Sequence, residues 1–241
     1  MTTLLQINSS IYGAAGASTQ LANEFVAAWL AVHPGDRAVV RDLAVNTPPH
    51  LDAARFAAFA AAPADRTALQ REAVSFSDEL IGELSAADVL VLGLPMYNYG
   101  VPTQFKAWFD HVARAGVTFN YTATGPRGAL SHLRAVVFAT RGGNYVDISK
   151  VDISKVDISK VDISKDDTSR VDTGKGDTGK VDTGNDHETA HLRQMFALIG
   201  ISDVQVIYAE GLARSGRAAS LATARLAVAS AVTEIAVRRV A

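Results

Sequence analysis

The first residues whose types and spacing suit a chemical role form the loop from Ser9 to Ser18, which reads SSIYGAAGAS. Small side chains leave backbone N–H groups accessible, and a helix that begins at Ser18 adds the positive end of its dipole. Such a loop suits a phosphate monoester and needs no lysine. It has neither the Gly-Lys-Ser/Thr ending of a Walker loop nor the G-x-G-x-x-G dinucleotide motif. A plain strand-to-helix turn with Ser18 as N-cap explains the same residues equally well.

A second segment, from Pro95 to Pro102, reads PMYNYGVP and directly follows a run of apolar residues. Two aromatic rings, an amide and a glycine at the end of a buried strand offer a flat ligand apolar faces and hydrogen bonds at its rim. An isoalloxazine ring needs both. Taken alone, the segment also fits an ordinary loop whose aromatic side chains shield the core.

A third segment, Thr140-Arg141-Gly142-Gly143, follows another apolar run. Paired glycines permit either a close backbone approach to a ligand or a turn with positive φ. Each of the three signals is weak by itself. Because all three follow predicted strands, however, they are expected to lie near one another at one edge of a sheet.

The elements that must position these loops are five short apolar runs with helical patterns between them. The predicted strands are Thr3–Ser9, Ala38–Leu43, Asp88–Leu94, Ala135–Thr140 and Val204–Ala209, the second being the most polar and therefore an edge. The predicted helices are Ser18–Val32, Arg66–Leu84, Thr103–Arg114, His187–Ile199 and Ser215–Val240. Strands that alternate with helices imply right-handed parallel βαβ units. The sequence therefore predicts an α/β, flavodoxin-like fold with a doubly wound parallel sheet of order 2-1-3-4-5, whose ligand lies at the switch point.

Residues 146 to 185 depart from that pattern, because they form eight consecutive pentads: VDISK four times, then DDTSR, VDTGK, GDTGK and VDTGN. Their apolar positions match neither the helical nor the strand period. We interpret the chain, 1–241, as a single domain interrupted by a repeat insertion at about 146–185. A solvated loop is the favoured form of the insertion, and a small β-helical structure is the alternative.

The amino-acid composition and net charge exclude several classes of function. The 241 residues include no cysteine, which excludes disulfides, thiolate metal sites and cysteine nucleophiles. A formal net charge of −2 gives no electrostatic basis for binding nucleic acid or an anionic membrane. No apolar run reaches the ~18–20 residues that span a bilayer, and the N-terminus does not resemble a signal peptide. We expect a cytoplasmic protein without nucleic-acid or membrane partners.

One further motif, His187-Glu188-Thr189-Ala190-His191, matches the H-E-x-x-H pattern that holds zinc on a helix. Gln194 and Ala197 stand where the metzincin continuation has glycine and a third histidine. Short motifs of this kind arise by chance. We therefore expect no metal site here, and interpret the two histidines as incidental surface residues.

Four segments together resemble the FMN-dependent NADH-azoreductase family, also described as FMN-dependent NADH:quinone oxidoreductases. They are SSIYGAAGAS, PMYNYGVPTQFKAWFDHVARAGVTFNYT, TRGG and FALIGISDVQVIYAEGL. The resemblance covers nearly the whole chain except about 145–185. It implies a flavodoxin-like homodimer with tightly bound FMN near the subunit interface. It also implies that NADH or NADPH gives two electrons, through FMN, to azo compounds or quinones.

The resemblance assigns expected roles to three groups of residues. Those that would hold the FMN phosphate are Ser10, Gly16, Ala17 and Ser18. Those that would line the isoalloxazine are Met96, Tyr97, Asn98 and Tyr99. Those that would wrap its pyrimidine side through backbone groups are Thr140, Arg141, Gly142 and Gly143. No catalytic side chain is expected beyond the flavin, and possible contacts to the acceptor are Asn98, Tyr99, Phe119 and Tyr121.

The chain departs from the family at Gly16-Ala17-Ser18, where Ser-x-Ser is common. The missing hydroxyl predicts weaker FMN retention but not its loss, since one neutral hydrogen bond contributes ~0.5–1.5 kcal/mol. The alternative function is a non-catalytic flavodoxin-like interaction module that binds partners through the pentads. It would keep the fold and lose FMN.

Overall fold

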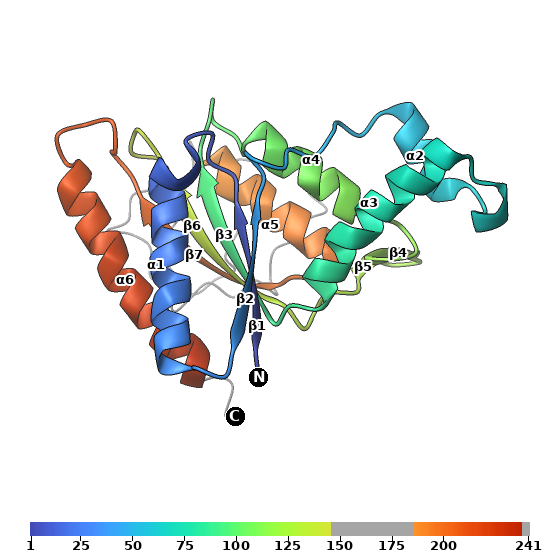
Figure 1. Ribbon diagram of the computed structural model, residues 1–241. Helices are drawn as coiled ribbons and strands as arrows, with labels where there is room; N and C mark the ends of the chain where they lie inside the picture. The colour runs from blue at the N-terminus through green and yellow to red at the C-terminus, as the bar shows by residue number, and fades with distance from the viewer. Residues whose placement is uncertain (146–185, 238–241) are drawn as a thin grey trace.

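The computed structural model describes residues 1–145 and 186–237, so the predicted pentad insertion lies outside the described residues. Its centre is a five-stranded sheet in which every neighbouring pair is parallel (Figure 1). The strands are β1 (Thr3–Asn8), β2 (Arg37–Asp42), β3 (Val89–Pro95), β6 (Arg134–Thr140) and β7 (Asp203–Ala209). They are arranged as β2-β1-β3-β6-β7, which confirms the predicted order.

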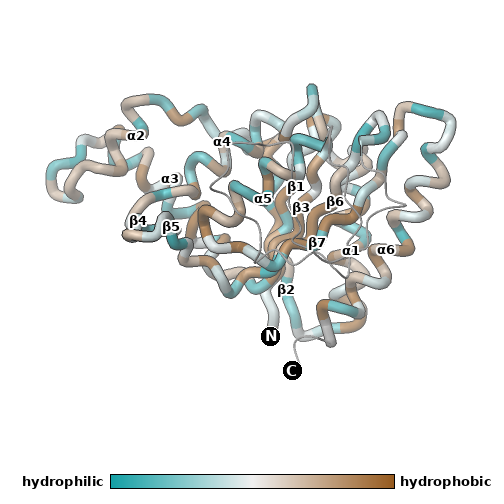
Figure 2. The backbone as a smooth tube through the Cα atoms, turned by 180° about the vertical axis from the view of Figure 1, so that it is seen from behind, coloured by the Kyte–Doolittle hydropathy of each residue, from teal (hydrophilic) through white to brown (hydrophobic). Residues whose placement is uncertain are grey.

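Helices cover both faces of this sheet. One face carries α1 (Ala17–Val32) and α6 (Arg217–Val237), and the other carries α3 (Ala68–Ser85), α4 (Thr103–Val112) and α5 (His187–Ile199). Figure 2 shows the most apolar segments along the central strands and the polar ones on the outer loops. Burial on both faces explains why β3 and β6 are almost continuously apolar. β2 lies at the edge and is only partly buried, as its polar sequence predicted.

Local signals explain where the helices begin and end. α3 begins with a capping box, in which Thr67 accepts from the backbone N–H of Gln70 and the Gln70 side chain accepts in return. The side chain of Asp186 caps α5 by accepting from the backbone N–H of Thr189. α5 ends at Gly200, whose φ of +98° is the left-handed conformation that glycine adopts most easily.

Helix α6 is long and apolar enough to cross a membrane by length and composition when a few charges are allowed, over Arg217–Ile235. One side of α6 nevertheless belongs to the core. Its buried residues Ala224, Val228, Ala231 and Ile235 recur at helical spacing and join a cluster with α1 and the sheet. Leu226, on the other side, is exposed. This stripe holds α6 on the sheet.

The sequence pattern missed α2 (Ala53–Ala60), which packs on α3, and a short antiparallel hairpin. The hairpin joins β4 (Phe119–Thr122) to β5 (Gly125–Gly128) and has no apolar alternation to reveal it. Its position depends instead on a distant contact. A Cβ atom at Gly128 would stand 2.0 Å from the backbone N of Gly200 at the end of α5.

That contact yields a prediction. Gly128→Ala should lower the free energy of unfolding by about 1–3 kcal/mol, because the added methyl group meets backbone that cannot move aside. Gly82→Ala is the matched control. Gly82 lies exposed within α3 with open space around it, so alanine should stabilise the protein by about 0.5–1 kcal/mol. Urea unfolding measures both, and equal effects of the two variants would contradict the proposed contact.

Candidate functional site

The three loops singled out in the sequence meet at the carboxyl edge of the sheet, at the top of Figure 1. They follow β1, β3 and β6, which are neighbours in the sheet. The backbone N–H and Oγ of Ser9 both donate to the carbonyl of Gly93, over 3.2 Å and 2.8 Å. The N–H of Met96 donates to the carbonyl of Thr140 over 2.9 Å. This is the edge at which open α/β sheets bind ligands.

The loop after β1 ends at the N-terminus of α1, where hydrogen-bonding capacity is unmet. The N-cap is Gly16, which offers no side-chain cap, and the first turn contains no acidic residue. The hydroxyls of Ser18 and Thr19 are buried without a hydrogen-bond partner in the described structure. Buried hydroxyls without partners are costly, and the first N–H groups of a helix attract anions. The residues present therefore fit a phosphate group.

At position 16 of this turn there is no room for a side chain, because Ser10 lies too close. A Cβ atom at Gly16 would stand 2.2 Å from the Ser10 hydroxyl, far inside contact distance. That hydroxyl accepts a hydrogen bond from the N–H of Tyr12 at 3.2 Å. The predicted phosphate residues Ser10, Gly16, Ala17 and Ser18 thus lie together, and Thr19, which sequence reasoning missed, lies beside them. Its place in the first turn of the helix was the available signal.

The aromatic loop after β3 contacts this turn directly. The phenol oxygen of Tyr97 accepts from the N–H of Ile11 at 3.2 Å and lies 3.4 Å from the Ser10 hydroxyl. Tyr97 and Gly100 exchange two backbone hydrogen bonds, which closes a tight turn over Asn98 and Tyr99. These two residues have positive φ values of 51° and 65°. Such strain at non-glycine residues is concentrated at functional sites.

Backbone hydrogen bonds join the glycine loop after β6 to the segment after β7. The carbonyls of Arg141, Gly142 and Gly143 accept hydrogen bonds from the backbone N–H groups of residues 212, 213 and 211, in that order. In the part of the chain that the structure describes, nothing accepts from the N–H groups of Gly142 and Gly143. They are the groups of this loop with donor capacity left for a ligand.

The side chain of Arg141 lies buried among three carboxylates. It contacts Asp186 at 2.6 Å through Nη2, Glu210 at 3.1 Å through Nη1 and Glu188 at 3.2 Å through Nε. Burial raises the pKa of Glu188 to about 8, although the attraction of Arg141 lowers it.

This contact changes the interpretation of the H-E-x-x-H motif. Its glutamate faces Arg141 in the interior, while His187 and His191 are exposed on α5. Among the described residues no three histidine, aspartate or glutamate side chains are grouped so as to hold a metal ion.

Two residues predicted as acceptor contacts lie apart from the loops. Phe119 is only 6% exposed and packs edge-on against Tyr121, which is 77% exposed. Both belong to the β4–β5 hairpin, which Figures 1 and 2 place beside α3 and away from the carboxyl edge. A further aromatic residue, Tyr145, does lie at the site, with its ring 5.8 Å from that of Tyr99. Tyr145 lies two residues beyond Gly143, the end of the third predicted loop, and was not among the predicted site residues.

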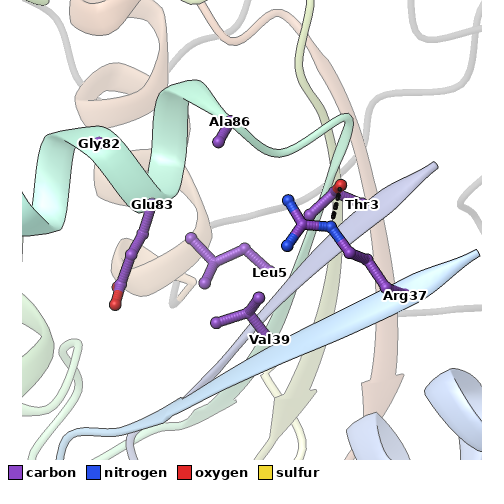
Figure 3. A pocket seen from close by; sticks show the side chains of 7 residues that line it. All are labelled: Thr3, Leu5, Arg37, Val39, Gly82, Glu83 and Ala86. Carbon is purple, nitrogen blue, oxygen red and sulfur yellow. Dashed lines mark hydrogen bonds between the residues drawn. The ribbon is translucent and has the colours of Figure 1, made fainter. Parts of the chain in front are cut away.

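A pocket of about 270 Å³ lies elsewhere, between the end of α3 and the starts of β1 and β2 (Figure 3). Leu5 and Val39 line it, and the Arg37 guanidinium donates to the Thr3 hydroxyl at its rim. Glu83 also lines the pocket but already pairs with Arg41. Because this is the amino edge of the sheet, opposite the convergent loops, we assign it no ligand.

Comparison with known proteins agrees with the fold. The profile of a family described by its flavodoxin-like fold matches residues 2–156. The FMN-dependent NADH:quinone oxidoreductase of Cellvibrio japonicus is 40% identical over 225 residues, covering 93% of this chain and 96% of the relative. FMN-dependent NADH:quinone oxidoreductase 2 of Pseudomonas putida is 41% identical over 216 residues, covering 90% and 91%.

Among solved structures, an FMN-dependent NADH-azoreductase from Bacillus anthracis in complex with FMN superposes with a TM-score of 0.76. It covers 98% of this chain and 99% of its own at 21% identity, so it supports the fold alone. The curated relatives are similar over nearly their whole length and carry the same name. The chain therefore belongs to the flavodoxin-like family of FMN-dependent NADH:quinone oxidoreductases.

Proposed function

We propose that the protein binds FMN at the carboxyl edge of its sheet and uses it to pass two electrons from NADH to a quinone or an azo compound. The observation that carries this proposal is the direct contact between an anion-binding turn and an aromatic loop. Tyr97 touches both the N–H of Ile11 and the Ser10 hydroxyl, so a phosphate group and a flat ring have adjoining places. A mononucleotide with a planar base has this shape.

Each loop has its own part in holding the cofactor. The first turn of α1, with Ser18 and Thr19, binds the phosphate. Residues 96–99 flank the ring, and the N–H groups of Gly142 and Gly143 donate to carbonyl oxygens of its pyrimidine side. Bound FMN supplies the hydride chemistry, while the protein provides orientation and polar contacts. No side chain in the three loops needs to act as an acid or base.

The protein also belongs to a dimer in this proposal. Tyr121 is exposed on a hairpin far from its own site, and Phe119 supports it from beneath. An exposed tyrosine is well suited to an interface, since it contributes apolar area and a hydrogen bond at low entropic cost. We place Tyr121 of one protomer over the acceptor position of the other, in a cytoplasmic homodimer. The relatives and the intact loops favour catalysis over the non-catalytic interaction module.

In the decisive experiment, the purified protein is saturated with FMN and then titrated with NADH in the absence of oxygen. About one equivalent of NADH should bleach the visible absorption of the flavin, and added quinone or azo dye should restore that absorption. Bound flavin that stays oxidised would contradict NADH as donor. A protein that retains no flavin would favour the interaction module.

The phosphate turn gives a second prediction. Gly16→Ala forces the Ser10 hydroxyl out of place, so the dissociation constant of FMN should rise about tenfold, or about 1.4 kcal/mol. Riboflavin, which lacks the phosphate, should bind as it does to the wild type. Gly35→Ala is the control, since nothing lies within 4 Å of its added methyl group. Fluorescence quenching measures both ligands, and equal losses for both would argue against a phosphate site.

The hairpin gives a third prediction. Tyr121→Ala should raise the KM for a quinone roughly two- to tenfold, as expected for the loss of an aromatic contact of about 0.5–1.5 kcal/mol. Tyr121→Phe keeps the ring and should keep the KM. FMN affinity should be unchanged in both variants. Light scattering should give twice the mass of the chain for the wild type, and a monomer with full activity would overturn the placement of Tyr121.

A further inference from the structure

The carbonyl group of Ser9 directly precedes the phosphate turn, Ser10–Ser18, and the sheet provides no donor for it. The N–H of Ser9 donates to the carbonyl of Gly93 at 3.2 Å, so Ser9 continues the ladder between β1 and β3. In a parallel ladder, the next bond runs to the Ser9 carbonyl from the residue two places beyond Gly93. That residue is Pro95, which has no N–H. Ser9 is fully buried, and a buried carbonyl without a donor is costly.

The side chain of Gln104 supplies the missing donor. Its Nε2 donates to the Ser9 carbonyl at 2.7 Å, and the bond is buried. Gln104 lies in the first turn of α4 and is only 8% exposed. Its Oε1 also accepts a longer hydrogen bond from the Thr103 hydroxyl at 3.4 Å. A side-chain amide thus takes the place of the backbone N–H that Pro95 lacks.

This hydrogen bond joins the two halves of the candidate site. Gln104 belongs to the helix that begins directly after the aromatic loop, Pro95–Pro102. Ser9 precedes Ser10, whose hydroxyl lies 2.2 Å from the place that a Cβ atom at Gly16 would take. The start of the phosphate turn is therefore fixed, through Gln104, to the helix that follows the aromatic loop.

The aromatic loop has anchors of its own. The N–H of Met96 donates to the carbonyl of Thr140 at 2.9 Å, and Tyr97 and Gly100 exchange two backbone hydrogen bonds. None of these bonds involves Gln104. The Tyr97 phenol adds a contact to the exposed part of the phosphate turn, but the buried start of the turn is held by Gln104. Loss of the Gln104 amide should therefore release the turn and leave the place of the ring intact.

We propose that Gln104 is a positioning residue for the cofactor phosphate: its amide donates where Pro95 cannot, and so holds Ser9 and the phosphate turn in place. The part of this inference that concerns ligand affinity rests on the proposed function. Gln104 acts through the Ser9 carbonyl and not by contact with the phosphate. A site whose donors are already in position binds more tightly than one that must first become ordered.

The first experiment compares the full-length wild type with Gln104→Met, in which the side chain has nearly the same length but no hydrogen-bond donor. The dissociation constant of FMN, measured by fluorescence quenching, should rise about tenfold, which corresponds to about 1.4 kcal/mol. The dissociation constant of riboflavin, which lacks the phosphate, should change less than about twofold. Ser77→Ala is the matched control. It removes a buried side-chain donor to the His111 carbonyl, outside the three loops, and should leave both constants as in the wild type.

A second substitution tests whether the missing donor is the cause. Pro95→Ala restores a backbone N–H at the position from which the ladder would bond the Ser9 carbonyl. Combined with Gln104→Met, it should recover at least about threefold of the lost FMN affinity. Made alone in the wild type it should give no such gain, because Gln104 already donates to that carbonyl. A role of Gln104 in packing alone predicts no recovery.

Hydrogen exchange in the FMN-free protein separates this inference from the proposed function. Gln104→Met should speed the exchange of the backbone amides of residues 11–13 at least about threefold, and Ser77→Ala should leave it unchanged. If the wild type binds no flavin, the proposed function fails, while the exchange rates still decide whether Gln104 holds the turn. Unchanged exchange in Gln104→Met, equal losses of FMN and riboflavin affinity, or no recovery with Pro95→Ala would overturn the inference.

Discussion

The close approach of helix α1 to strand β3 is the constraint on which the candidate site depends. At Gly93 an added Cβ atom would stand 3.1 Å from the carbonyl oxygen of Ser18 and 3.3 Å from the Asn8 side chain. The absence of a side chain at this point lets the first turn of α1 settle directly against the sheet. The unpartnered hydroxyls of Ser18 and Thr19 therefore lie at the ends of the central strands, next to the loop that begins at Pro95. A bulkier residue at Gly93 would separate the two halves of the site.

The features that sequence reasoning predicted are those encoded in short stretches of chain. The five strands, the five long helices and the strand order followed from continuous apolar runs that alternate with helical patterns. The proximity of the three loops could be predicted in the same way, because parallel strands bring their carboxyl ends to one edge of the sheet. The resemblance in the glycine and aromatic loops predicted the family to which the chain belongs, and the curated relatives confirm that prediction.

What the sequence did not reveal depends on contacts between distant residues. The β4–β5 hairpin is too short and polar to be recognised, and it is placed by the contact of Gly128 with Gly200. Arg141 was predicted to serve through its backbone, and nothing local indicated that its side chain joins three carboxylates. Glu188 attracted attention only within an apparent zinc motif. Residues 45 and 69 positions from Arg141 become its partners only after the sheet has formed.

The geometry of the Arg141 cluster also bears on the long segment that separates β6 from α5. Tyr145, the last described residue before that segment, is held by Glu210, and Asp186, the first one after it, is held by Arg141. Arg141 and Glu210 thus fasten both of these positions to the same buried cluster. Loss of the Arg141 guanidinium would therefore disturb the end of the glycine loop and the start of α5 together, because one buried group of charges holds both.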